Sequence, residues 1–101
     1  MNKDLSISKL NDVYGSLLTA KQNELIKQFY DDDLSLGEIA ENEGITRQAA
    51  HDTINKGVVA LKKYESELML SEILDKLKCI DSSMSKADIL KEIDNIINLR
   101  E

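Results

Sequence analysis

The middle of the chain reads LGEIAENEGITRQAA, from Leu36 to Ala50, and this segment is the most informative about the fold. Just before it, Ser35 is followed three residues later by Glu38, a capping-box pattern that marks the start of a helix. Gly44 stands where that helix should end, because glycine adopts the left-handed backbone of a helix C-terminus without a Cβ penalty. The pattern therefore predicts a short helix over residues 36–43.

A second helix follows at once. Thr46 is a good N-cap residue, so we expect this helix to begin at Arg47 and to run to about Tyr64. Ala40 is small where the two helices must approach closely. The residues expected to point inward and hold the two helices at a fixed angle are Ile39, Ile45 and Ala50. Two helices joined by so short a turn predict a helix-turn-helix.

The polar residues at the start of the second helix are the candidate functional residues. In a helix-turn-helix the second helix enters the major groove of DNA, with its N-terminal residues nearest the base edges. Arginine reads guanine there, and glutamine or asparagine reads adenine, by paired hydrogen bonds. The predicted DNA-binding residues are Thr46, Arg47, Gln48, His51, Asn55 and Lys56.

The flanking sequence is helical as well. Apolar residues from Leu5 onward recur three and four apart and predict a first helix that ends near Gly15. Thr19 and Gln22 form another capping box, which opens a helix before the acidic run Asp31–Asp33. Beyond the core at residues 19–64, residues 65–101 carry two amphipathic stripes, separated by a break that ends at the predicted cap Ser85. Gly57 lies inside the long helix, where glycine costs about 1 kcal/mol relative to alanine.

Composition limits the fold class to all-α. The 101 residues include no proline, four glycines and only four aromatic residues, too few turn and strand signals for a β-sandwich or barrel. No glycine-rich loop exists for a Rossmann or P-loop fold. The length matches one domain over residues 1–101.

Nothing in the sequence points to an enzyme, a metal site or a cofactor. The single Cys79, which we expect to be buried or half-buried beside an apolar stripe, excludes a disulfide framework and a thiolate zinc site. The acids Asp31–Asp33 do not start a calcium loop, since Leu36 and Asn42 occupy the places of its glycine and its glutamate. No signal peptide and no apolar run of membrane-spanning length is present, so we expect a cytoplasmic protein with no membrane partner.

Charge argues against tight binding to DNA. The chain has 13 basic and 19 acidic residues and a formal charge of −6, whereas affinity for duplex DNA comes largely from Lys and Arg. Residues 35–64 alone are neutral, with four residues of each sign. Their basic residues lie in the second helix: Arg47, Lys56, Lys62 and Lys63. We therefore expect weak, salt-sensitive binding that a dimer would strengthen.

Several segments together resemble the YlxM family of small bacterial proteins. They are LTAKQ at residues 18–22, Tyr30, DDLSLGEIA at residues 32–40, and TRQA at residues 46–49 with Asp52 and Ile54. The resemblance covers roughly residues 5–75. It implies a helix-turn-helix similar to the promoter-reading region 4 of sigma factors. By that similarity Arg47, Gln48, His51 and Asn55 lie on the helix that reads the −35 element.

The resemblance also implies two functions. One is a DNA-binding regulator. The other is an adaptor that binds a protein or RNA component of the signal recognition particle, an idea suggested by the usual position of the family's gene beside that of the particle's GTPase. An acidic surface suits a basic protein partner. The neutral-to-acidic surface and Gly57 in the long helix depart from a sigma region 4.

The C-terminal stripes leave two interpretations open. Their apolar residues would pack either within one chain or against a second copy. Closed two-fold dimers are the commonest oligomers, and we expect a homodimer formed through residues 65–101.

Overall fold

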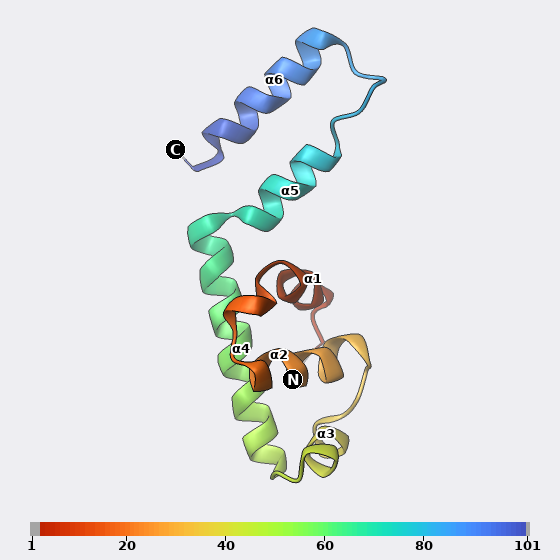
Figure 1. The fold of residues 1–101 in the computed structure, drawn as a ribbon, viewed down its shortest axis with the longest axis vertical. Helices are drawn as coiled ribbons and strands as arrows, with labels where there is room; N and C mark the ends of the chain where they lie inside the picture. Colours follow the sequence, from red (N-terminus) through yellow and green to blue (C-terminus); the bar gives the residue numbers. More distant parts are fainter. Residues whose placement is uncertain (1–2, 101) are drawn as a thin grey trace. The chain divides into compact units, whose positions relative to one another are not determined.

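The structure is a computed structural model that describes residues 3–100 and shows an all-α protein (Figure 1). No strand occurs in this described range. Its helices are α1 (Leu5–Tyr14), α2 (Ala20–Ile26), α3 (Leu36–Glu43), α4 (Arg47–Leu68), α5 (Leu70–Lys78) and α6 (Lys86–Ile97). Short 3-10 turns follow α1 (Gly15–Leu17) and α6 (Asn98–Arg100), and α2 continues as a π-helical turn (Lys27–Asp31). The chain divides into two compact units, residues 1–67 and residues 68–101.

The predicted helix boundaries are largely confirmed. Thr19 and Ser35 each form a capping box with the side chain three residues on, and Ser85 caps α6. Two details of the prediction are wrong. The helix that begins at Arg47 continues past Tyr64 to Leu68, and Cys79 is exposed.

The core of the first unit is one apolar cluster. Its buried members come from α1 to α4 and the turns between them, and they are Ile7, Tyr14, Leu25, Ile26, Phe29, Leu36, Ile39, Ala40, Ala50, Ile54 and Leu61. Of the three residues expected to face inward, Ile39 and Ala50 are buried and Ile45 packs partly buried against the cluster. Ala40, expected to be small at the close approach of the two helices, is buried as well. This core fixes α3 and the first half of α4 as one rigid piece.

Gly57 has a packing role that the helix propensity scale does not capture. It is buried, and a Cβ placed on it would lie 2.5 Å from Cδ1 of Ile26 and 3.3 Å from Cβ of Gln22. Glycine here lets α2 and α4, which lie beside each other in Figure 1, approach closely. The cost of glycine within the helix is thus offset by this contact.

Two polar contacts join segments of the first unit that are distant in sequence. The hydroxyl of the buried Tyr14 donates to Oε1 of Glu65 at 2.6 Å, which joins the end of α1 to the last turns of α4. Lys3 bonds to Asp33 at 2.7 Å, and its ammonium lies 4.4 Å from the centre of the Phe29 ring. The acidic run Asp31–Asp33 therefore has a structural partner at the N-terminus.

The second unit buries far less apolar surface. Among its described residues, Ile96 is its only buried apolar side chain. Along α5 and α6 the exposed apolar side chains are Leu70, Leu77, Leu90, Ile93 and Ile97, with Ile97 67% exposed. None of the helices in the described range is long and apolar enough to span a membrane.

Candidate nucleic-acid interface

The turn between α3 and α4 has the geometry that its sequence predicts. Gly44 takes φ +66° and ψ +33°, the left-handed region that glycine enters at no steric cost. Its N–H donates to the carbonyl of Glu41 at 3.3 Å, and the next N–H, of Ile45, donates to the carbonyl of Ala40 at 3.0 Å. This pair of bonds is a Schellman motif, which ends α3 and turns the chain sharply.

The start of α4 is capped as predicted. Oγ1 of Thr46 accepts a hydrogen bond from the backbone N–H of Ala49 at 3.0 Å. Since the cap satisfies one of the free N–H groups of the first turn, it fixes where α4 begins and so which side chains occupy its first exposed turn.

A polar contact also ties the end of α3 to α2. Glu43 accepts a hydrogen bond from Lys21 at 2.8 Å and another from Gln28 at 2.8 Å. The bond from Lys21, followed by that from Gln28, lowers the pKa of Glu43 below its ordinary value. The stabilisation from this carboxylate is therefore present at neutral pH and is lost only as the pH falls through the lowered pKa.

Replacing Gly44 with alanine should destabilise the first unit by about 1 kcal/mol, because a left-handed backbone is strained for any residue with a Cβ. No atom of the described residues lies within 4 Å of the added Cβ, so the cost comes from the backbone alone. Gly37→Ala is the matched control, since Gly37 lies exposed in the first turn of α3 and alanine should stabilise it by roughly 0.5–1 kcal/mol. Urea unfolding measures both changes. Equal effects of the two substitutions would contradict the turn geometry.

The structure places all six sequence-predicted residues on the first three turns of α4 and its cap. Thr46, Arg47, Gln48, Asn55 and Lys56 are exposed and His51 is half-buried. The opposite side of the helix carries the buried Ala50, Ile54, Gly57 and Leu61. The exposed face thus presents hydrogen-bonding side chains on a helix whose orientation is set by the core.

Asp52 lies on the same exposed face, although it is not among the six predicted DNA-binding residues. Its Oδ1 accepts a hydrogen bond from Nε2 of Gln48 at 2.8 Å and lies 3.4 Å from Nδ1 of His51. The four-residue spacing between Gln48 and Asp52 was the available signal, because side chains four apart on a helix are neighbours.

The charges around this face are mixed. Within the described residues, Arg47, Lys56 and Lys63 take part in no ion pair, so their charges are available to a ligand. Two carboxylates of α3, those of Glu38 and Glu41, are also exposed. The exposed surface of these two helices therefore carries charges of both signs.

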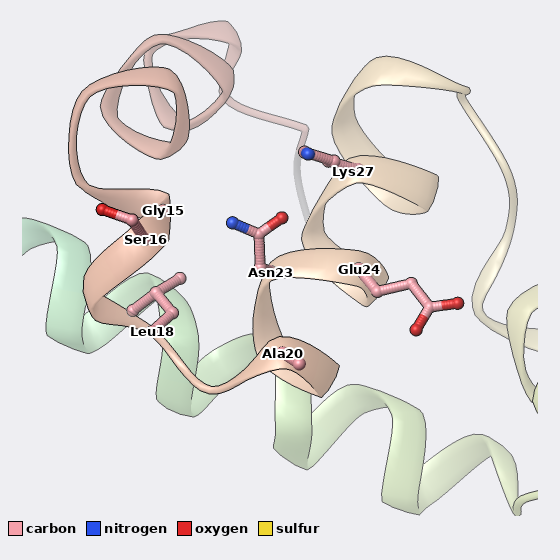
Figure 2. A pocket seen from close by; sticks show the side chains of 7 residues that line it. All are labelled: Gly15, Ser16, Leu18, Ala20, Asn23, Glu24 and Lys27. Carbon is pink, nitrogen blue, oxygen red and sulfur yellow. The ribbon is translucent and has the colours of Figure 1, made fainter.

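A shallow pocket elsewhere on the first unit contains none of the predicted residues. Figure 2 shows it between the turn after α1 and helix α2, with the amide of Asn23 at its centre. Its lining residues are Gly15, Ser16, Leu18, Ala20, Asn23, Glu24 and Lys27. A Cβ on Gly15 would clash with Asn23 and lie 2.9 Å from Oδ1 of Asn11, a buried oxygen that has no hydrogen-bond partner among residues 3–100.

The turn, the caps and the inward-facing residues together define a helix-turn-helix protein. Over residues 1–99 the chain matches the family described as "UPF0122: Putative helix-turn-helix protein, YlxM / p13 like". That description names a helix-turn-helix protein and not an enzyme.

Individual relatives agree with this match. A UPF0122 protein of Fusobacterium nucleatum subsp. nucleatum is 35% identical over 101 residues, covering 96% of this chain and 98% of that protein. One of Halalkalibacterium halodurans is 36% identical over 107 residues and covers 98% of both. A third, of Desulforamulus reducens, is 53% identical over 64 residues, which are 63% of this chain and 55% of that protein. The chain belongs to the UPF0122 (YlxM/p13-like) family.

Proposed function

We propose that this protein is a regulator that binds duplex DNA and reads the major groove with the first turns of α4. The observation that carries the proposal is the exposed polar face at the start of that helix, held by a capped, glycine-ended turn. Arg47 and Gln48 lie at its N-terminal end, where the reading helix of a helix-turn-helix comes closest to base edges.

The unpaired cations of α4 support the proposal. Arg47 at the N-terminus of the helix and Lys56 and Lys63 further along it are exposed and lie on the solvent side of the helix. The hydrogen bonds from Ser6 lower the pKa of Asp4, and the nearby charge of Lys62 lowers it further. We expect local positive charge of this kind to contact phosphates although the whole chain is acidic.

Titration of a fluorescent duplex pool at increasing salt tests this proposal. If Lys56, Lys62 and Lys63 each contact one phosphate, raising the salt from 50 to 200 mM should weaken binding by roughly fortyfold. Affinity that does not change with salt, or no retention of duplex at 50 mM, would contradict a phosphate-contacting role.

We further propose that two copies associate through α5 and α6. This second unit has only 34 residues, residues 68–101, and units below about 40 residues usually need a partner, a metal or disulfides to be stable. Its exposed Leu77, Leu90, Ile93 and Ile97 supply apolar surface that a second copy would bury. A dimer would also double the phosphate contacts that the acidic chain needs.

Light scattering should give a mass near twice the 11.4 kDa of one chain. Ile93→Asp with Ile97→Asp should convert the protein to a monomer, because burying two carboxylates in an apolar interface is costly. Asn95→Asp is the control, since Asn95 is an exposed polar residue of the same helix. A monomer mass for the parent chain at high concentration would refute the dimer.

The second candidate function is an adaptor that binds a basic protein or an RNA component of the signal recognition particle. The exposed Glu38 and Glu41 of α3 favour this alternative in its protein-binding form, because the first helix of a DNA-reading pair crosses the phosphate backbone. Glu38→Gln with Glu41→Gln separates the two functions. If the chain binds DNA, the loss of two negative charges should raise its affinity for DNA. If it is an adaptor, the same loss should lower its affinity for a basic protein partner.

A further inference from the structure

The hydrogen bond between Gln48 and Asp52 determines how the Gln48 amide is presented. Nε2 of Gln48 donates to Oδ1 of Asp52 at 2.8 Å, across one turn of α4. Both residues are exposed, so the bond is made on the surface that the proposed function assigns to DNA. An unrestrained glutamine side chain would instead sample several rotamers and both amide orientations.

The amide chemistry leaves a specific pair of atoms available. A primary amide has two N–H groups, one on the side of its carbonyl oxygen and one on the far side. In the paired recognition of adenine, the amide carbonyl oxygen accepts a hydrogen bond from N6 of the base. One amide N–H donates a hydrogen bond to N7. If Asp52 takes the far N–H, the oxygen and the near N–H of Gln48 remain free together.

We infer that Asp52 is a positioning residue that holds Gln48 in the orientation that reads adenine. The inference rests on the proposed function, because it assigns the base that Gln48 reads in the groove. It also explains why an acidic residue lies on a face that approaches phosphates. The carboxylate lowers the affinity for DNA of any sequence, but by orienting Gln48 it favours one base.

Two substitutions separate positioning from charge. Asp52→Asn removes the negative charge but keeps an acceptor oxygen, whereas Asp52→Ala removes both. Asp52 is exposed, so neither substitution disturbs the core. A role in charge alone predicts the same outcome for both variants. A positioning role predicts that only alanine changes the base preference.

Selection from randomised duplex DNA, with parent, Gln48→Ala, Asp52→Asn and Asp52→Ala in parallel, gives the first test. The position at which Gln48→Ala loses its preference identifies the base that Gln48 reads. There we expect adenine for the parent and for Asp52→Asn, and an adenine preference about tenfold lower for Asp52→Ala. If Asp52→Ala prefers adenine at this position as strongly as the parent does, the inference is overturned and the proposed function is left intact.

The free protein gives a second test that does not need DNA. In ¹⁵N-labelled protein, the side-chain amide signals of Gln48, assigned by their loss in Gln48→Ala, should shift in Asp52→Ala and much less in Asp52→Asn. Unchanged signals in Asp52→Ala would overturn the inference whatever the DNA result. If the signals shift but the parent enriches no motif, the proposed function fails, and the base assignment fails with it.

Discussion

Gly57→Val should destabilise the first unit by roughly 3 kcal/mol, the upper part of the range for overpacking a core. Even a single Cβ at this position lies 2.5 Å from Cδ1 of the fully buried Ile26 and 3.3 Å from Cβ of Gln22. The two further methyl groups of valine would force α2 and α4 apart. Tyrosine fluorescence during urea unfolding is the appropriate measurement, because Tyr14, Tyr30 and Tyr64 all belong to the first unit.

Gly57→Ala, combined with Ile26→Val as a compensating change, tests the same contact quantitatively. Alanine regains about 1 kcal/mol of helix propensity, so its net cost should be only about 1 kcal/mol. Ile26→Val removes the Cδ1 atom that the new Cβ would strike, at a cost of about 1 kcal/mol by itself. The double variant should then be about 1 kcal/mol more stable than the sum of the two single changes predicts. An alanine variant more stable than the parent would contradict the close contact.

The second large effect concerns DNA. Arg47→Ala with Gln48→Ala should weaken binding to the preferred sequence by about a hundredfold, because each paired contact with a base contributes roughly 1–3 kcal/mol. Both side chains are exposed, so the variant should unfold at nearly the parent's urea concentration. Fluorescence anisotropy with a labelled duplex measures the change.

Lys63→Ala is the matched control for this double variant. Lys63 is exposed on the same helix but lies sixteen residues beyond Arg47, too far along α4 to reach the same bases. Its loss should weaken binding to every sequence alike and reduce the salt slope by about one. A Lys63→Ala variant that discriminates between sequences would argue against base reading by the N-terminal turns.

Local signals in the sequence predicted most of the helix boundaries. The capping boxes at Thr19 and Ser35 and the left-handed Gly44 depend on residues within four positions of one another, and all three occur in the structure. Such contacts do not require knowledge of which helices meet. The candidate site could be proposed for the same reason, since its six predicted residues lie in one short stretch of the chain, residues 46–56.

Contacts between distant residues were not predictable in this way. The role of Gly57 depends on Ile26, thirty-one positions earlier, and the propensity scale alone gives it only a cost. The extension of α4 to Leu68 accompanies the bond from Tyr14 to Glu65, which spans 51 positions. The attachment of Glu43 to Lys21 and Gln28 is likewise set by tertiary packing.

Selection from randomised duplex DNA at low salt, followed by deep sequencing, tests whether the start of α4 reads bases. The parent chain and the Arg47→Ala, Gln48→Ala double variant are carried through the same rounds. We expect the parent to enrich one motif and the double variant to enrich none. Equal weak retention of both proteins, with no motif in either pool, would contradict base reading and favour the adaptor function.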